Sequence, residues 1–229
     1  LIYGSHPRQK LDVYIPKAKS IKTPIVFVYG GAWREGNKQD FKFVAHALTS
    51  LGHPVIIPDY RPFPANFPDF INDVADAITY FENRAEKFLN KPMNKIILMG
   101  HSAGAHTVAL LATDKKYLQS RNLKAKVSGL IAMAGPYDLD LKNEEVAPVF
   151  KNATRQQTNP TLNIHSEMPP ILLIHGLADN RVFPFHTERF EKALLKSNIK
   201  VTKRLYKGVN HTKLIGSLAA PLRFLNNTF

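Results

Sequence analysis

The segment 100–104, Gly-His-Ser-Ala-Gly, limits the possible folds of this chain more than any other stretch. It follows the apolar run 95–99, which has the character of a strand, and it precedes residues 105–112, whose apolar positions recur with helical spacing. A strand, a sharp turn and a helix, with serine at the apex of Gly-x-Ser-x-Gly, form the local context of a nucleophile elbow. The glycines allow strand and helix to approach closely while the hydroxyl of Ser102 projects outward. The alternative is an ordinary strand-to-helix turn with a capping serine, so the choice depends on partner residues elsewhere.

Strand-like and helix-like patterns alternate along the rest of the chain. Short apolar or alternating runs predict strands at residues 11–15, 24–29, 54–58, 95–99, 127–133, 171–175 and 200–206. Amphipathic spacing predicts helices at residues 41–51, 67–88, 105–112, 184–196 and 212–226, the last one interrupted near Pro221. Such alternation is typical of an α/β fold with a mostly parallel sheet and helices on both of its faces.

The length of the chain indicates how many domains it forms. Its 229 residues are enough for one α/β domain with a full core and too few for two. Residues 140–168 are polar and weakly periodic, and we interpret them as a small cap or connecting excursion. The sequence contains no internal repeat and no low-complexity segment. We therefore expect residues 1–229 to form a single domain with a minimal cap.

The composition excludes some classes of protein and leaves others open. No cysteine is present, which rules out disulfides, thiolate catalysis and cysteine-based metal sites. The formal net charge is +13, from 31 Lys and Arg against 18 Asp and Glu, but the basic residues are scattered and form no nucleic-acid motif. No apolar run approaches the length of a membrane span, so we expect neither a nucleic-acid partner nor stable membrane association. The chain begins at Leu1 rather than Met, which leaves the compartment and an upstream signal peptide open.

A serine hydroxyl becomes an effective nucleophile only when a neighbouring base takes its proton and an acid orients that base. On this architecture the chain order is serine, then acid, then histidine. Asp179 follows a buried strand, which places it at the carboxyl edge of the sheet, and His211 lies in the loop after the last strand. The predicted catalytic set is therefore Ser102, Asp179 and His211. Asp138, which also ends a strand, is the alternative acid, and His165 in the polar excursion is the alternative base.

A pair of glycines supplies a fourth element of the predicted site. Acyl transfer places negative charge on the carbonyl oxygen, and backbone N–H groups aimed at that oxygen stabilise it. Gly30 and Gly31 follow the strand 24–29, and their lack of side chains lets N–H groups approach a substrate. Together with the N–H of Ala103 they form the predicted oxyanion hole. Trp33 is a candidate substrate-binding wall residue, although a core position explains it equally well.

Taken together, these residues resemble the α/β-hydrolase superfamily over nearly the whole chain. The resemblance is strongest to small serine esterases with a His-Gly-Gly-x-Trp oxyanion motif, a group that includes bacterial carboxylesterases, feruloyl-esterase-like proteins, kynurenine formamidases and hormone-sensitive-lipase relatives. Further similarities lie in the segments 11–16, 59–61 and 135–139. Tyr29 stands where the group usually carries a histidine that shapes the oxyanion loop through hydrogen bonds. A tyrosine hydroxyl can do similar work, so we expect an altered loop geometry with retained activity.

The resulting hypothesis is a serine hydrolase that cleaves carboxylic esters of short acyl or small aromatic substrates through an acyl-enzyme intermediate. The short excursion cannot build a large lid, which favours an open pocket. We expect no metal and no organic cofactor, and the expected partner is a small-molecule ester; the sequence does not define an oligomeric state. An arylformamidase-type amidase that takes N-formylkynurenine-like substrates is the alternative within enzymes. A non-catalytic binding protein on the same fold is the alternative outside them.

Overall fold

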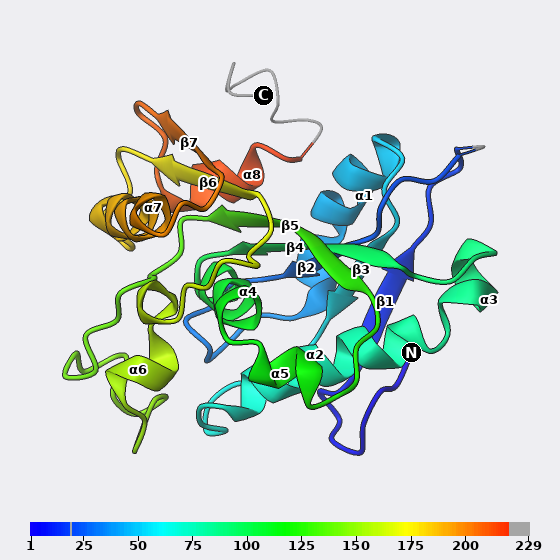
Figure 1. The fold of residues 1–229 in the computed structure, drawn as a ribbon, viewed down its shortest axis with the longest axis horizontal. Coiled ribbons are helices and arrows are strands. Elements are labelled where there is room, and N and C mark those ends of the chain that lie inside the picture. The colour runs from blue at the N-terminus through cyan, green and yellow to red at the C-terminus, as the bar shows by residue number, and fades with distance from the viewer. Residues whose placement is uncertain (19, 220–229) are drawn as a thin grey trace.

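A seven-stranded sheet forms the centre of the computed structural model, which describes residues 1–18 and 20–219 (Figure 1). The strands lie in the order β1-β3-β2-β4-β5-β6-β7 across the sheet. β1 is antiparallel to β3, and every other neighbouring pair is parallel, which confirms the predicted mostly parallel sheet. The bounds of the strands are β1 Leu11–Tyr14, β2 Ile25–Val28, β3 Val55–Pro58, β4 Lys95–His101, β5 Lys126–Met133, β6 Ile171–Gly176 and β7 Val201–Tyr206.

β2 and β3 are apolar throughout because both of their faces are covered. All four residues of β2 and all four of β3 are buried. β7 lies at the edge of the sheet, and its residues alternate between exposed and partly buried. A continuous apolar run therefore predicts the middle of this sheet, and an alternating run predicts its edge.

Helical elements cover both faces of the sheet. In Figure 1, α1 and α8 lie above the sheet, and α2, α4 and α5 lie below it. α4 follows β4 directly and contacts β2, β4 and β5, so its N-terminus lies at the middle of the sheet's carboxyl edge. The bounds of the helical elements are η1 Lys38–Phe41, α1 Lys42–Ser50, α2 Asp69–Glu82, α3 Ala85–Leu89, α4 Ala103–Thr113, α5 Lys116–Gln119, α6 Arg155–Thr158, η2 Pro160–Leu162, α7 Phe185–Lys196 and α8 His211–Gly216.

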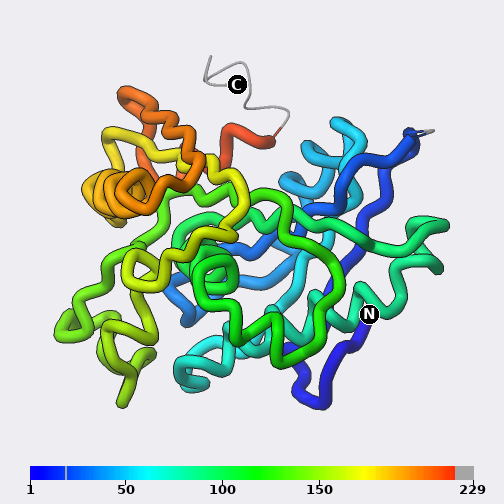
Figure 2. The backbone as a smooth tube through the Cα atoms, in the orientation of Figure 1, coloured from blue at the N-terminus to red at the C-terminus, as the bar shows by residue number. Residues whose placement is uncertain are grey.

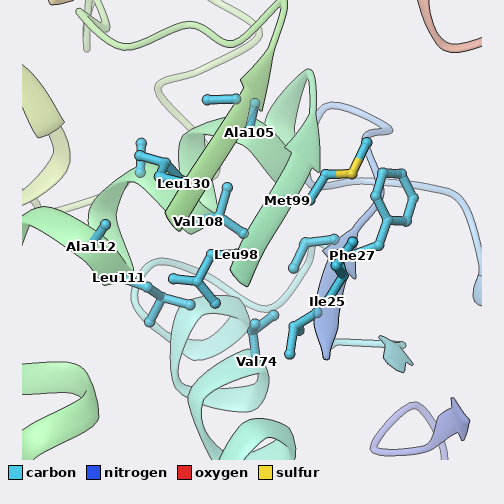
Figure 3. Packing of buried hydrophobic residues seen from close by; sticks show 14 of the residues in the cluster. Ile25, Phe27, Val74, Leu98, Met99, Ala105, Val108, Leu111, Ala112 and Leu130 are labelled. Atoms are coloured by element: carbon cyan, nitrogen blue, oxygen red, sulfur yellow. The ribbon is translucent and has the colours of Figure 1, made fainter. Parts of the chain in front are cut away.

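The core between the sheet and the helices below it holds β4 and α4 together. Figure 3 shows Leu98 of β4 and Leu130 of β5 close to Val108 of α4. Met99 lies beside Phe27 on the other side of the strand, as the alternation of side chains along a strand requires. Burial of each such aliphatic side chain stabilises the fold by about 1.5–3 kcal/mol. This packing clamps β4 and α4 on either side of the turn that joins them.

The predicted helix 67–88 is in fact two helices. α2 ends at Glu82, and Arg84 leaves the helical region, with φ −123° and ψ 4°, before α3 begins. The break directs Ala85 and Leu89 into the core, where both are buried. Because these apolar residues continue the helical spacing of α2, the sequence pattern does not reveal the interruption.

The predicted closing helix 212–226 is also shorter than expected. It begins one residue earlier, at His211, and ends at Gly216, whereas residues 220–226 of the prediction lie outside the described residues. Glycine disfavours the helix, and the Ser217 hydroxyl donates to a backbone carbonyl of the last turn at 2.7 Å, which competes with helix continuation.

The polar excursion 140–168 carries two short helical elements, α6 and η2. Figure 2 shows it as the yellow-green to yellow stretch at the left of the molecule. Thr154 and Gln157 form a capping box at the start of α6, and η2 contacts α4 and α7. The excursion therefore packs against the helices of the sheet domain, and the organisation of residues 1–229 as one domain stays a prediction.

Candidate active site

The predicted nucleophile elbow has the expected backbone geometry. Ser102 lies between β4 and α4 with φ 57° and ψ −125°, a strained conformation of the kind that accumulates at functional sites. A Cβ atom on Gly100 would lie 2.4 Å from the carbonyl oxygen of Gly104, and a Cβ on Gly104 would lie 2.0 Å from that of Val28. Both positions therefore require glycine, because the turn presses α4 against the ends of β2 and β4.

The predicted acid and base are directly hydrogen-bonded to each other. Nδ1 of His211 donates to Oδ2 of Asp179 at 2.7 Å, and Asp179 is buried while His211 is partly buried. Since Nδ1 carries the proton of this bond, Nε2 of the neutral ring is left as the proton acceptor. Asp179 follows β6 and His211 follows β7, and the two residues are 32 positions apart in the sequence.

Several groups hold the Asp179 carboxylate in its charged form. Oδ1 accepts hydrogen bonds from the N–H groups of Arg181 (3.0 Å) and Val182 (2.9 Å). Nε2 of His175 lies 3.3 Å from Oδ2. Burial by itself raises the pKa of Asp179, but the bonds from His175, His211 and Val182 outweigh burial and hold that pKa well below its usual range.

A close backbone approach brings the acid and base loops together. The N–H of Ala178 donates to the carbonyl of Val209 at 3.0 Å. A Cβ atom on Gly176, the last residue of β6, would lie 2.1 Å from the same carbonyl oxygen. Glycine at this position therefore allows the two loops to pack closely enough for the bond between Asp179 and His211.

Ser102 and His211 line one hollow of about 390 Å³. Gly30, Gly31 and His101 line it as well, so nucleophile, base and the glycine pair meet in the same space. We call this space the first hollow. The structure thus brings together Gly30, Ser102 and His211, which are far apart in the sequence, as the sequence prediction requires.

The glycine pair is packed against the nucleophile. A Cβ on Gly30 would lie 2.8 Å from Cβ of Ser102, and a Cβ on Gly31, which has φ 120°, would lie 2.2 Å from the carbonyl oxygen of Glu35. Within the described residues, no group accepts a hydrogen bond from the N–H of Gly30, Gly31 or Ala103. These donors are therefore free to serve a ligand oxygen beside Ser102.

Tyr29 anchors the glycine loop through a buried hydrogen-bond network. Its hydroxyl donates to Oδ1 of Asp59 at 2.7 Å and accepts from Arg8 at 3.0 Å. Arg8 also donates to the carbonyl of Gly36 at 2.5 Å, and the hydroxyl of Tyr60 donates to the carbonyl of Tyr29 at 3.1 Å. Burial, with Tyr60 and Asp59 nearby, raises the pKa of Tyr29 far above its usual range, so the hydroxyl keeps the proton that it donates.

Trp33 is both a core residue and a wall residue. Only 4% of it is exposed, and its ring packs edge-on against Phe150 with centroids 4.8 Å apart. It also lines a second hollow of about 440 Å³ on another side of Ser102, together with Ala103, Phe183 and Phe185 among others. We call this space the second hollow. Trp33 is therefore a core residue that also borders a hollow, and its role in substrate binding stays a prediction.

The alternative acid and base are engaged elsewhere. The carboxylate of Asp138 accepts hydrogen bonds from Arg155 (2.6 Å) and Arg189 (2.7 Å), although the residue lines the second hollow. Nε2 of His165 bonds to the carbonyl of Ala112 at 3.2 Å. Neither residue lines the first hollow beside Ser102.

Sequence reasoning missed several residues that border the two hollows. The ring of His101 lies with its centroid 4.7 Å from that of His211, and its Nε2 lies 3.2 Å from the carbonyl oxygen of His211. Phe183 and Phe185 lie just after Asp179, within Arg-Val-Phe-Pro-Phe. Two phenylalanines in the short loop after the predicted acid are the signal that could have found them.

The described ranges 1–18 and 20–219 hold neither a cluster suited to a metal ion nor a helix able to span a membrane. No group of three or more His, Asp or Glu residues there is arranged to hold a metal ion. In the same ranges, no helix combines the length and the apolar character needed to cross a membrane.

The sheet order and the strained turn between β4 and α4 are those of the α/β-hydrolase fold. Residues 11–194 match the family model named BD-FAE. The chain therefore belongs to the BD-FAE family.

Two of the curated relatives that this chain resembles are named as a methylesterase and a formamidase. An isoprenylcysteine alpha-carbonyl methylesterase of Arabidopsis thaliana is 31% identical over 97% of this chain and 58% of its own length. The kynurenine formamidase of Salmo salar is 28% identical over 94% of this chain and 75% of its own length. The chain thus spans somewhat more than half of the plant relative.

Among solved structures, a truncated carbohydrate esterase from gut microbiota superimposes with a TM-score of 0.84 and 23% identity, covering 96% of this chain and 90% of that one. The apo form of Thermogutta terrifontis esterase 2 gives a TM-score of 0.80 and 22% identity, covering 98% and 92%. At these identities the likeness concerns the fold.

Proposed function

We propose that this chain is a serine esterase that cleaves carboxylic esters through an acyl-enzyme intermediate. The observation that carries the proposal is the 2.7 Å bond between His211 and Asp179, beside a hollow that Ser102 also lines. In the neutral ring, that bond places the proton on Nδ1 and leaves Nε2 as the acceptor that a general base for a serine hydroxyl requires. The esterase names of the plant relative and of the two structural neighbours support the same reaction class.

The reaction proceeds in two balanced steps. Nε2 of His211 takes the hydroxyl proton of Ser102 as Oγ attacks the ester carbonyl carbon, and the resulting oxyanion accepts bonds from the N–H groups of Gly30, Gly31 and Ala103. The bond from carbon to the alcohol oxygen breaks, and His211 gives its proton to that oxygen. Water then attacks the acyl-enzyme with His211 as base again, which releases the carboxylic acid and regenerates Ser102.

The substrates we propose are esters with short acyl groups or a small aromatic ring. The first and second hollows, of about 390 and 440 Å³, are at the small end of the usual range for ligand pockets. Only short helical elements, α6 and η2, occur in the excursion 140–168, which supports an open site rather than one under a large lid.

A panel of substrates tests this proposal. We expect hydrolysis of p-nitrophenyl acetate and butyrate at rates well above that of the octanoate, and loss of all three in Ser102→Ala. Removal of a catalytic serine typically lowers kcat by about 10⁶. A Ser102→Ala variant that keeps the wild-type rate would refute the serine mechanism, and equal rates on short and long esters would refute the substrate range.

An arylformamidase is the second candidate, because the Salmo salar relative matches over 94% of this chain. The chemistry differs only in the leaving group, an amine in place of an alcohol. N-formylkynurenine in the same panel separates the two: a clear preference for it over p-nitrophenyl acetate assigns the amidase activity. If wild type is silent on the whole panel and a fluorophosphonate probe fails to label Ser102, a binding protein on this fold is the remaining interpretation.

A further inference from the structure

The first and second hollows meet at the nucleophile but have different linings. Of the described residues, Ser102 and Arg181 are the two that line both. His211 lines the first hollow and is absent from the lining of the second. Ala103 and Trp33 line the second hollow and are absent from that of the first. A bound ester therefore has two distinct spaces for the two parts that separate when it is cleaved.

The proposed reaction decides which part enters which space, so this inference rests on the proposed function. The imidazolium of His211 must pass its proton to the alcohol oxygen as the ester bond breaks. A general acid works only within hydrogen-bond reach of the atom it protonates, so the alcohol must lie on the side of His211. This side is the first hollow. The acyl group, which stays on Ser102, is left with the second hollow.

The lining of the second hollow indicates the kind of acyl group that fits there. Phe183 is 54% exposed and Phe185 is 39% exposed, and both line this hollow. Their rings are nearly parallel, with an interplanar angle of 14° and centroids 6.3 Å apart. Phe185 is held in place by the ring of His186, 4.2 Å away, and by the guanidinium of Arg189, 4.7 Å above it. Exposed large apolar side chains that are gathered on one site mark a surface for binding.

Polar side chains form part of the lining of the first hollow. Glu35, Asp40 and Thr212 line it and are exposed. Gly31 of the glycine loop lines the same hollow. Phe41 also lines this hollow, but it is partly buried and stacks on Tyr29. The first hollow therefore presents no pair of exposed aromatic rings like Phe183 and Phe185, and its lining suits a compact alcohol.

We propose that the second hollow is the acyl pocket, that the first hollow takes the alcohol, and that Phe183 and Phe185 determine specificity for acyl groups that carry a flat ring. Stacking on an aromatic side chain and burial against it favour such a ring over a methyl group. Because these phenylalanines touch only the acyl part, their removal changes selectivity among acyl groups and leaves selectivity among alcohols as it is.

Two substrate ratios separate the acyl side from the alcohol side. The acyl ratio compares kcat/KM for p-nitrophenyl 3-phenylpropanoate with that for p-nitrophenyl acetate, which share one alcohol. The alcohol ratio compares 1-naphthyl acetate with p-nitrophenyl acetate, which share one acyl group. In the double variant Phe183→Ala/Phe185→Ala we expect the acyl ratio to fall by about tenfold. The alcohol ratio should stay at its wild-type value in this variant and in both single variants. Leu177→Ala, which removes another exposed apolar residue of the same loop outside both hollows, is the matched control and keeps both ratios.

The converse variant is Thr212→Phe, which narrows the first hollow from an exposed position. We expect it to lower the alcohol ratio and to keep the acyl ratio. The assignment of the hollows would be overturned if the alcohol ratio fell in the variants of Phe183 and Phe185. It would also be overturned if neither ratio changed in any variant. Thermal unfolding of each variant verifies its fold. If wild type hydrolyses these esters and Ser102→Ala does not, a negative result concerns the hollows alone; if wild type hydrolyses none, the proposed function itself fails.

Discussion

The nucleophile side and the base side of the candidate site are built by different physical means. On the nucleophile side, glycines allow backbone segments to touch: Gly100 contacts Gly104, and Gly104 contacts the end of β2. On the base side, hydrogen bonds join two loops, above all the bond between His211 and Asp179. The nucleophile side therefore depends above all on glycine at close backbone contacts. The base side adds a hydrogen bond between two side chains to the close backbone approach at Gly176.

The largest expected effect is on kcat, and it comes from removing the charged hydrogen bond between Asp179 and His211 on the base side. Asp179→Asn keeps the shape of the side chain, but its amide can donate to Nδ1 of His211 and so favour the wrong tautomer. We expect kcat on p-nitrophenyl acetate to fall by about 10⁴, with KM little changed. Asp138→Asn, which alters the alternative acid, is the comparison and should cost far less in kcat. Equal losses in the two variants would contradict the assignment of Asp179.

On the nucleophile side, we expect a substitution of glycine to lower the free energy of unfolding. Gly104→Ala places a methyl group 2.0 Å from the carbonyl oxygen of Val28, so backbone segments must separate. We expect the free energy of unfolding to fall by about 3 kcal/mol or more, which is the range of severe overpacking. Gly129→Ala is the matched control, because its Cβ would meet nothing closer than 3.6 Å. Urea unfolding of both variants measures the difference, and similar midpoints would show that the elbow tolerates a side chain.

The smallest expected effect is on the pH dependence of the free energy of unfolding. It sharpens the comparison because buried histidines on the nucleophile side and Asp179 on the base side change protonation in different pH ranges. Burial lowers the pKa of His101 to about 3 and that of His106 to about 4. The unfolded chain binds these protons near pH 6.5 and the folded chain does not, so stability falls as the pH falls from about 6.5 toward 4. On the base side, Asp179 has a depressed pKa, and its contribution is lost only as the pH falls below the unfolded carboxylate value of about 3.9.

His106→Gln tests this separation. Each buried histidine contributes a slope of about 1.4 kcal/mol per pH unit while the unfolded chain alone is protonated. We therefore expect the free energy of unfolding of the variant to depend less on pH between 6 and 5 by about that slope. Unfolding in urea at several pH values provides the measurement. A variant with the wild-type slope would show that His106 is not the buried neutral group that the structure places in α4.

The alternation of strands and helices and the elbow were predictable because each rests on residues that are close together in the sequence. The run of β4, the glycines of the turn and the periodicity of α4 all lie within 95–113. The same local reasoning joined α2 and α3 into one helix, since the apolar spacing continues through the break at Arg84. Local patterns thus predict which elements form better than where they end.

Residues that act by location in space were harder to predict. In the sequence, Tyr29 is only a departure from a familiar motif. The folded chain shows its hydroxyl bonded to Asp59 and Arg8, residues 30 and 21 positions away. Phe183 and Phe185 carry no motif, and only the packing of their loop places them in the second hollow. Such roles depend on several segments meeting, which no local window contains.

By itself, the sequence determined the α/β class, the turn at Ser102 and the order in which Ser102, Asp179 and His211 occur along the chain. The tertiary structure alone decided that Asp179 bonds to His211 while Asp138 is held by two arginines. It also decided that two separate hollows meet at Ser102. The physical reason is that backbone conformation and burial periodicity are properties of short segments, whereas a hydrogen bond between loops and the shape of a hollow exist only after the sheet has brought its strand ends together.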